Sequence, residues 1–350
     1  MKVKIQKPLL ESIVTQLIPF TEKRDNTLIT SHILIDADNN LTLKATDKEI
    51  GIKIQTDAQI IEKGKITING KKLHNILKAL KNDEIEIKNK EDTIIITQQN
   101  SIYKLISFNP NEFPEFPNPE DLNKLEINKE EFIDAIKKTF PVIDINNPKV
   151  ELNGELFDIQ EKTNFVSTDT RRLAIYYSQG KGNKKQIIVP KRALSEVKRI
   201  FKEDMDIFYD DIYLIIKNEQ TLLFTKLING TFPDYKKIIP NNFKYELKIP
   251  KEIFTNHLKQ VSIVSTEVKI TITKDKIIFE SISDETIQAK TSFEYESKIE
   301  EFTFGVNSKY LLDFLQSIEN EEFKLCLNDP NIPFMLRDGK FITIVMPLMI

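Results

Sequence analysis

The residues that could catalyse a reaction or bind a metal are few and scattered along this chain of 350 residues. Its three histidines, His32, His74 and His257, stand in unrelated settings, and none has a cysteine or carboxylate at the spacing of a metal-ligand set. We expect each to be an ordinary surface or helix histidine. The sequence also lacks the glycine-rich phosphate loops and the GxSxG nucleophile elbow of common enzyme folds. These features predict no catalytic residue, no metal and no cofactor.

Two pairs of carboxylates and one thiol remain as candidates. Asp210 with Asp211, and Asp36 with Asp38, could be metal ligands, and a nuclease built on Asp210 and Asp211 is one hypothesis. Their neighbours are typical of strand edges and turns, which favours a structural role. Cys326 lies in a strand-like apolar run, where we expect an inert buried thiol. It has no second cysteine for an internal disulfide, which suits a reducing cytoplasm.

Composition places the chain among soluble globular proteins. Apolar residues make up 40% and charged residues 29%, as is typical of that class. Residues 1–5 alternate like a strand with no apolar segment behind them, so we expect no signal peptide. No apolar run is long enough to span a membrane. We therefore expect a cytoplasmic protein without membrane contact. Its net charge of −3 argues only weakly against nucleic-acid binding, because partners respond to local charge.

The elements that must position any site occur in three similar stretches. Lys7, Lys129 and Lys251 recur at intervals of 122 residues, and each opens a helical pattern after a short alternating strand. The strands expected before them cover residues 3–5, 125–127 and 247–249. A second helix recurs later in each stretch, with asparagine, proline or serine at its start, and strand-like runs follow it.

This repeat predicts an α+β protein with three repeated domains of one fold, each with two helices plus antiparallel sheets. Links rich in proline and asparagine, at residues 109–119 and 240–243, separate the repeats. We therefore expect the first domain at residues 1–120, the second at 121–244 and the third at 245–350. A period this long fits whole domains and is too long for the unit of a solenoid.

Several of the expected helices combine an apolar face with a basic face. At 100° per residue, the helix expected from Lys191 to Lys202 has its apolar side chains opposite its cations. The cations that align in this way in three helices are Lys191, Arg192, Lys198, Arg199 and Lys202, then Lys71 and Lys78, then Lys251 and Lys259. A charged helix face is often only a solvated face. Its recurrence in an acidic protein nevertheless predicts a cationic surface that contacts phosphates without reading bases.

One stretch near the middle of the chain, residues 167–177, predicts two strands joined by a tight turn at Asp169-Thr170, with two arginines after the turn. Two further stretches are suited to pack beside it, residues 230–240 and the last five residues, 346–350. We expect the three together to form a groove for peptides of other proteins. We also expect Asn229-Gly230 to be a hairpin turn, since Asn-Gly is a strong signal for one.

A series of short motifs runs through the whole chain. The motifs are Leu152-Asn153-Gly154, residues 168–174 (TDTRRLA), Val189-Pro190-Lys191, residues 232–235 (FPDY), residues 262–265 (SIVS), residues 305–310 (GVNSKY) and Met346-Pro347-Leu348. In these motifs and in its threefold repeat, the chain resembles the bacterial DNA sliding clamp, the beta subunit of DNA polymerase III. The resemblance implies a head-to-tail homodimer that forms a closed ring, with helices lining the hole.

The resemblance also implies the partners. The ring would encircle duplex DNA without sequence preference and, with no chemistry of its own, act as a processivity factor. It would tether the alpha subunit of the replicative DNA polymerase, the clamp loader and other proteins that carry a clamp-binding motif. Such motifs are short and contain a glutamine and bulky apolar residues. The alternative hypothesis is a monomeric, sequence-independent nucleic-acid-binding repeat protein, which would use the same basic faces without a matched interface between its end domains.

The resemblance assigns residues to three kinds of contact. The partner-peptide groove would comprise Leu152, Thr168, Thr170, Arg171, Arg172, Leu173, Pro233, Lys237, Ile238, Asn307, Tyr310, Val345, Met346, Pro347, Leu348 and Met349. In the dimer interface, Tyr103 and Leu105 would meet Ile263 and Val264 of the other chain, and Lys72 would face Asp284 or Glu285 there. Turns containing Lys23, Arg24, Asn146 and Lys149 would lie near the duplex, beside the helix cations.

The sequence departs from the family pattern at the rim of the groove. Thr170-Arg171 stands where the family often has Gly-His, which makes the rim bulkier and more cationic. Lys237 replaces an arginine and loses its bidentate geometry. The chain ends in Leu348-Met349-Ile350, without an arginine near the terminus. These differences bear on which partner motif binds best.

Overall fold

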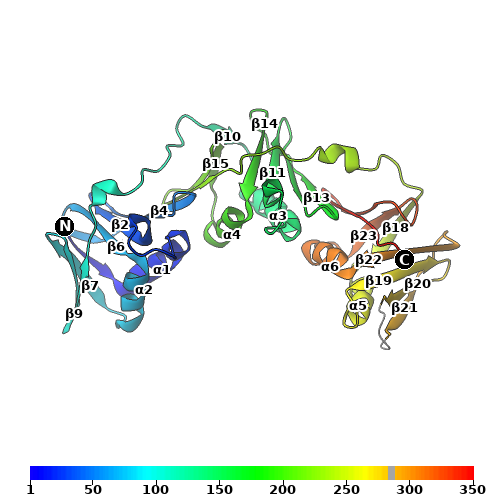
Figure 1. The fold of residues 1–350 in the computed structure, drawn as a ribbon, viewed down its shortest axis with the longest axis horizontal. Helices are drawn as coiled ribbons and strands as arrows, with labels where there is room; N and C mark the ends of the chain where they lie inside the picture. The colour runs from blue at the N-terminus through cyan, green and yellow to red at the C-terminus, as the bar shows by residue number, and fades with distance from the viewer. Residues whose placement is uncertain (283–287) are drawn as a thin grey trace. The chain divides into compact units, whose positions relative to one another are not determined.

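The computed structural model describes residues 1–282 and 288–350. Asp284 and Glu285, the expected acidic partners of Lys72, lie outside these residues. The chain forms two compact units, and Figure 1 labels many of their elements. The first unit combines Met1–Glu126 with Ser195–Leu227, and the second combines Ile127–Leu194 with Ile228–Ile350.

The element order repeats three times, as the sequence predicts. Each repeat has a strand, a helix, further strands, a second helix and closing strands. The helices of the described residues are α1 (Lys7–Leu17) and α2 (Gly70–Ala79), α3 (Lys129–Thr139) and α4 (Lys191–Ile200), and α5 (Lys251–Ser262) and α6 (Ser308–Ser317). Asparagine side chains cap three of them. Asn69, Asn128 and Asn307 accept hydrogen bonds from the backbone N–H of Lys72, Glu131 and Lys309, respectively.

The first unit contains two antiparallel sheets, with strand orders β5-β1-β7-β8-β9 and β10-β15-β16-β17-β4-β3-β2-β6. The strands of the smaller sheet are β1 (Lys2–Gln6), β5 (Gln59–Glu62), β7 (Glu84–Lys90), β8 (Thr93–Gln98) and β9 (Ser101–Ile106). The larger sheet contains β2 (His32–Ala37), β3 (Leu41–Thr46), β4 (Ile50–Thr56), β6 (Gly64–Asn69), β10 (Asn123–Leu125), β15 (Asp206–Tyr209), β16 (Tyr213–Lys217) and β17 (Thr221–Lys226). In β3 and β8, alternate residues are buried, as for strands with one face in a core.

The second unit also contains two antiparallel sheets, with strand orders β14-β11-β12-β13-β25-β24-β23-β18 and β21-β20-β19-β22. The larger sheet contains β11 (Gly154–Ile159), β12 (Asn164–Thr168), β13 (Arg172–Tyr177), β14 (Lys185–Pro190), β18 (Tyr245–Pro250), β23 (Glu322–Leu327), β24 (Phe334–Asp338) and β25 (Phe341–Val345). The strands of the smaller sheet are β19 (Glu267–Thr273), β20 (Lys276–Ser281), β21 (Lys290–Glu294) and β22 (Glu301–Asn307). A 3₁₀ turn, η6 (Tyr235–Ile238), follows β17 along the chain and belongs to this unit.

Neighbouring repeats share a sheet because strands pair across the boundary between them. In the first unit, the closing strand β17 of the middle repeat pairs with β4 of the first repeat. In the second unit, the closing strand β25 of the third repeat pairs with β13 of the middle repeat. Since β13 and β4 occupy the same place in their repeats, the two junctions follow one rule.

Two local predictions differ from the structure. The strand before α3 covers Asn123–Leu125 and ends before Ile127, where the sequence pattern predicts strand through residue 127. The hairpin turn predicted at Asn229-Gly230 is wrong, because these residues lie in an extended link between β17 and η6. Gly230 is not among the residues with positive φ in the described chain, so this Asn-Gly pair lacks the backbone of a type I′ turn.

Close packing at the junction of β4 and β17 generates a prediction about stability. Gly51 lies directly opposite Phe224, and a Cβ added to Gly51 would stand 2.3 Å from an atom of the buried Phe224 ring. We expect Gly51→Val to lower the free energy of unfolding by about 1–3 kcal/mol through overpacking, as measured by urea denaturation. Gly230→Ala is the matched control, because its Cβ would meet only the Glu151 side chain, at 3.2 Å. Equal stability of the two variants would contradict this account of the junction.

Candidate functional site

The histidines and the cysteine do not form a reactive centre in the described residues. His32 is buried in β2 and stacks on Phe108 with ring centroids 4.2 Å apart, so the expectation of a surface or helix histidine is wrong for it. Burial lowers the pKa of His32 to about 4, which keeps the ring neutral. His74 and His257 lie on α2 and α5. Burial raises the pKa of the Cys326 thiol to about 11, so it stays protonated at neutral pH.

The acidic pairs serve local structure. Oδ1 of Asp210 accepts hydrogen bonds from the backbone N–H groups of Ile212 (2.7 Å) and Tyr213 (2.5 Å), which closes the turn between β15 and β16. Asp36 and Asp38 form ion pairs with Lys65 (2.9 Å) and Lys63 (2.6 Å). Across residues 1–282 and 288–350, no group of three or more histidines, cysteines and carboxylates could hold a metal ion.

The central stretch forms the turn that the sequence predicts. Oδ1 of Asp169 accepts hydrogen bonds from the backbone N–H groups of Arg171 (3.0 Å) and Arg172 (2.9 Å), and the Thr168 hydroxyl donates to the Arg172 carbonyl (2.7 Å). These bonds connect β12 to β13. Thr170 has φ of +76°, a conformation that a β-branched residue rarely adopts, so the surrounding bonds must hold it.

Arg172 points into the protein and not toward a partner. Its side chain is 4% exposed, with Nε 2.9 Å from Asp169, Nη1 2.7 Å from Asp313 of α6, and Nη2 3.1 Å from the carbonyl oxygen of Pro141. The guanidinium also lies 4.5 Å from the ring centroid of Tyr310. The resemblance places Arg172 in the peptide groove, but in the structure its donors are bound within the fold. Instead it fixes the turn to α6.

The C-terminal tail lies between this turn and β22. The backbone N–H of Met346 donates to the carbonyl of Arg171 (2.9 Å), and that of Leu348 donates to the carbonyl of Gly305 (2.8 Å). Gly305 permits this close approach, since an added Cβ would stand 2.6 Å from the side chain of Ile350. Met346 remains 40% exposed and Met349 90% exposed, so the tail presents flexible apolar side chains to solvent.

The segment around η6 supplies a second set of exposed residues. Pro233, Lys237 and Ile238 are exposed, whereas Phe232 and Tyr235 are buried in one core cluster with Leu152 and Leu173. The Tyr235 hydroxyl donates to Oδ2 of Asp158 in β11 (2.7 Å). The η6 segment and the central sheet therefore rest on the same core.

The predicted groove residues divide into a supporting group and an exposed group. Leu152, Leu173 and Val345 are buried, so they support the surface and do not line it. Asn307 caps α6, Tyr310 stacks under Arg172, and Thr168 holds the turn. The residues left at the surface are Thr170, Arg171, Pro233, Lys237, Ile238, Met346 and Met349, with Pro347 and Leu348 half-buried. Together they offer apolar surface beside cationic side chains.

Several residues of this site were missed in the sequence. Asp169 and Gly305 stand inside the motifs TDTRRLA and GVNSKY. Asp169 matters because it pairs with the buried guanidinium of Arg172, and the sequence does not indicate that burial. Asp313 is four residues after Lys309, with which it also pairs at 2.6 Å, and this helical spacing is a usable signal. Nothing in the sequence pattern indicates the contact between Tyr235 and Asp158.

The predicted DNA-contacting residues are mostly exposed, with three exceptions. Exposed members are Lys23, Arg24, Lys71, Lys78, Asn146, Lys149, Arg192, Arg199, Lys202 and Lys259, and Lys198 is half-buried. The ammonium of Lys191 donates to the carbonyl of Ile143 (2.7 Å) and lies over the Phe140 ring, and that of Lys251 donates to the carbonyl of Ile318 (2.5 Å). Lys191 and Lys251 thus hold helix ends together, which reduces their availability to phosphates.

The residues expected at a dimer interface lie on exposed features. Tyr103 and Leu105 are on β9, an edge strand of its sheet, and with Lys72 they line a hollow of about 670 Å³. Ile263 directly follows α5 and is 85% exposed, and Val264 beside it is half-buried. An apolar side chain this exposed on a folded protein indicates a contact surface.

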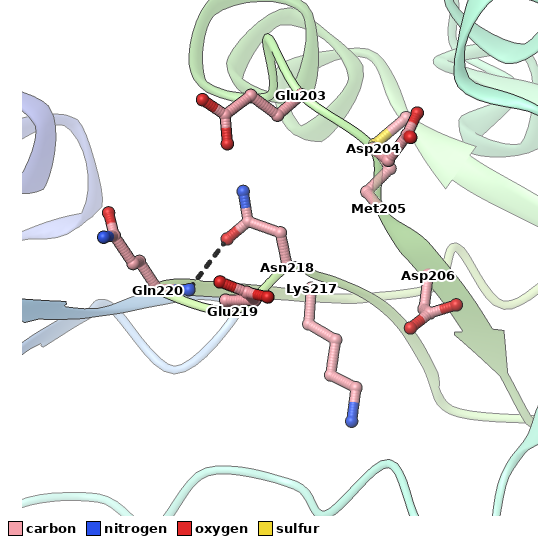
Figure 2. Close-up of a pocket in the computed structure, with 8 residues that line it drawn as sticks. All are labelled: Glu203, Asp204, Met205, Asp206, Lys217, Asn218, Glu219 and Gln220. Atoms are coloured by element: carbon pink, nitrogen blue, oxygen red, sulfur yellow. Dashed lines mark hydrogen bonds between the residues drawn. The ribbon is translucent and has the colours of Figure 1, made fainter.

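Figure 2 shows a different hollow, of about 770 Å³, in the first unit. Its lining includes Glu203, Asp204, Asp206 and Glu219, which project from the residues around β15 and β16. Four carboxylates repel a phosphate backbone, so we assign this hollow no part in nucleic-acid binding.

The fold and the site define a class of protein: three repeats of one α+β domain that present an apolar surface between two of them. Family models described as the N-terminal, central and C-terminal domains of the DNA polymerase III beta subunit match residues 1–117, 126–234 and 236–348. The chain therefore belongs to the DNA polymerase III beta subunit family, the beta sliding clamps. Proteins of this family are non-catalytic processivity factors.

Individual relatives agree with this assignment. The chain is 36% identical to the beta sliding clamp of Helicobacter pylori strain J99, over 99% of this chain and 100% of that one. A crystal structure of the Helicobacter pylori beta clamp bound to a DNA ligase peptide is 36% identical, covers 100% of both chains and has a TM-score of 0.95. The DNA polymerase sliding clamp from Bacillus subtilis shares the fold, with a TM-score of 0.94 at 21% identity over 100% of this chain and 99% of that one.

Among the described residues, no helix is long and apolar enough to cross a bilayer.

The ion pairs of Arg172 generate a second prediction. Arg172→Ala is expected to lower the free energy of unfolding by about 3 kcal/mol, because it leaves the partly buried Asp169 and Asp313 without their counter-charge. Arg171→Ala is the matched control, since the neighbouring side chain is exposed and only its backbone binds the tail. Guanidinium chloride unfolding of both variants measures the difference. If Arg171→Ala cost as much as Arg172→Ala, the buried network would not be the source of stability.

Proposed function

We propose that two copies of this chain form a head-to-tail ring that encircles duplex DNA and tethers replication proteins through the groove of the second unit. The domains of the ring are residues 1–120, 121–244 and 245–350 of each copy. The ring works in the cytoplasm, where its lone cysteine stays reduced. The observation that carries the proposal is the rule by which strands pair between successive repeats.

Within residues 1–282 and 288–350, the pairing rule leaves one edge of β9 and one edge of β21 unpaired. Closing strands β17 and β25 pair with β4 and β13, respectively. Each of these partners is the third strand after the first helix of its repeat. The closing strand of the first repeat, β9, ends its sheet, and β21, which occupies the place of β4 and β13 in the third repeat, also ends its sheet. Pairing of β9 with β21 of a second copy satisfies the same rule. Two such heterologous contacts related by a two-fold axis close a ring.

Side chains beside these edges support the same contact. Tyr103 and Leu105 of β9 meet Ile263 and Val264 of the second copy, and Lys72 lies at the hollow beside them. Removal of Ile263, which is almost fully exposed here, from water favours association. An unpaired strand edge is also a surface that a folded protein ordinarily covers or charges.

The exposed cations contact the phosphates of the duplex. Lys23, Arg24, Lys71 and Lys78 of the first unit, and Asn146 and Lys149 of the second, carry this role with the exposed part of α4. Phosphate contacts carry no base information, so binding is independent of sequence and weakens with salt.

The surface formed by Ile238, Met346 and Met349 receives short peptides from the polymerase alpha subunit, the clamp loader and other clamp-binding-motif proteins. The relative from Helicobacter pylori was crystallised with a DNA ligase peptide, and it matches this chain over its whole length. Methionine side chains adapt to partners of different shape, as a shared docking surface requires.

Topological retention tests the ring. The protein is loaded with its own clamp loader and ATP onto nicked circular DNA, and the circle is then cut in high salt. We expect retention on intact circles and loss from cut ones, because a ring slides off an end whatever its affinity for phosphates. Equal retention on both forms, measured by gel filtration, would instead favour a monomeric nucleic-acid-binding protein.

Peptide affinity tests the groove. We expect Ile238→Ala with Met346→Ala to weaken a peptide containing a glutamine and bulky apolar residues by about 10- to 100-fold, since both side chains are exposed apolar anchors. Fluorescence anisotropy gives the affinity, and light scattering checks that the dimer mass is unchanged. Leu173 is unsuitable for this test because it is buried in the core. Ile332→Ala, another exposed apolar residue of the same unit, is the control. Unaltered binding by the double variant would disprove the groove assignment.

A further inference from the structure

We propose that the buried hydrogen bond between Tyr235 and Asp158 is a latch that holds one wall of the peptide groove in its binding position. Both are positioning residues, since neither reaches the surface that would contact a partner. The inference rests on the proposed function, and it concerns how the groove keeps its shape before a peptide arrives.

The wall in question is the segment around η6, and it holds its own shape weakly. The backbone hydrogen bonds at its two ends are long, from Lys237 N–H to the carbonyl of Asp234 (3.3 Å) and from Ile239 N–H to the carbonyl of Lys236 (3.4 Å). The ion pair between Lys237 and Asp234 spans 3.2 Å and is largely exposed, so it adds little. A segment of this kind needs an external anchor to keep Ile238 in one place.

Tyr235 provides that anchor. Its hydroxyl donates to Oδ2 of Asp158 at 2.7 Å and accepts from the side-chain amide of Asn164 at 3.0 Å. Oδ1 of Asp158 accepts from the amides of Gln160 (3.0 Å) and Gln186 (3.2 Å). The phenol and the carboxylate are both buried, so the bond is shielded from water.

The charge of Asp158 strengthens the latch. Burial acts to raise the pKa of Asp158, but the hydrogen bonds from Tyr235 and the two glutamine amides outweigh it and leave the pKa below its usual value. Lys236 also lies 3.1 Å from Oδ2, at the exposed end of the pair. The carboxylate is therefore ionised at neutral pH, and a hydrogen bond to an ionised acceptor is stronger than one between neutral groups.

The first unit contains the matching positions without the latch. Asp36 stands opposite Lys65 in register, as Asp158 stands opposite Gln186, and it forms an ion pair with Lys65. The link there reads Phe113-Pro114-Glu115-Phe116 where the second unit has Phe-Pro-Asp-Tyr, so the aromatic ring has no hydroxyl. Phe116 packs edge-on against Phe224, with centroids 4.8 Å apart.

This internal comparison indicates what the hydroxyl adds. In the first unit, the Phe116 ring packs against Phe224, which fills the space beside Gly51, and its centroid lies 5.5 Å from the Lys44 ammonium. In the second unit, Tyr235 packs into the core cluster with Leu152 and Leu173, while Ile238 on the same segment stays at an exposed surface. A directional bond to a buried carboxylate fixes the position of η6 without filling that surface.

Loss of the latch should weaken peptide binding, because it reduces the fraction of molecules whose wall is in its binding position. If the wall leaves its position for part of the time, the apparent peptide affinity falls by the competent fraction. A hydrogen bond to a charged group is worth enough to change that fraction by about tenfold. Tyr235→Phe in the full-length dimer is therefore expected to weaken binding of the glutamine-containing peptide about tenfold, with the dimer mass unchanged.

A conservative change at the other partner separates positioning from general stability. Asp158→Asn retains an oxygen that accepts from Tyr235, and the glutamine amides can rotate to accept from its new N–H group. We expect its peptide affinity to fall by only about threefold, less than in Tyr235→Phe, because the hydrogen bond remains but its acceptor is neutral. Hydrogen exchange at the amides of Lys237 and Ile239 should accelerate in Tyr235→Phe and remain slow in Asp158→Asn.

Phe116→Leu is the matched control, because it alters the equivalent aromatic residue of the other link. It should leave peptide affinity unchanged even if it lowers stability. Equal peptide affinity of Tyr235→Phe and the unchanged protein would overturn the latch while leaving the groove intact. Weakening by Phe116→Leu to the same degree would also overturn it, since the effect would then be general loosening. Failure of the unchanged protein to bind the peptide would overturn the groove itself, and the latch with it.

Discussion

The proposed peptide-binding surface of this protein depends on one buried guanidinium. Arg172 binds Asp169 within its own turn and Asp313 in α6, so two segments far apart in the sequence share a single set of charges, and its bond to the carbonyl of Pro141 adds a third segment. A buried ion pair of this kind adds little net stability when complete, but loss of one member is costly. These side chains are therefore held in one arrangement, in which every charge is paired. The carbonyl of the neighbouring residue, Arg171, accepts a hydrogen bond from the N–H of Met346. The same turn therefore also positions the C-terminal tail.

The repeat builds the same turn at another junction and uses it differently. In residues 46–48 and 168–170, the middle aspartate accepts hydrogen bonds from the backbone N–H groups two and three residues after it, and the third residue of each has φ of +76°. After the turn, the first unit has Gly51 where the second has Leu173, and the ring of Phe224 occupies the space that the glycine leaves. The backbone scaffold thus comes from the repeat, while side-chain volume decides whether a junction is filled or presents a surface.

Much of the fold could be predicted from the sequence, because its strongest signals are local and repeated. The interval of 122 residues between Lys7, Lys129 and Lys251 marks equivalent helix starts, and the apolar periodicity of each helix is read directly from its residues. What could not be predicted depends on contacts distant in sequence. An arginine pair next to an apolar run gives no sign that Arg172 is buried and its neighbour exposed. The stacking of His32 on Phe108 likewise requires the tertiary fold.

The helix lysines have two roles in this protein: some join helices, and others contribute to the cationic surface. Lys251 donates to a carbonyl at the end of α6, and Lys191 to one beyond α3, so each joins the two helices of its repeat. Arg199 is paired with Glu196 at 2.6 Å. The cationic surface is therefore weaker than the sequence suggests. For the proposed ring this is no disadvantage, because escape from a closed circle requires opening of the ring and not release of phosphates. Weak, screened contacts instead allow sliding, and two grooves per ring compensate for modest peptide affinity by raising the effective concentration.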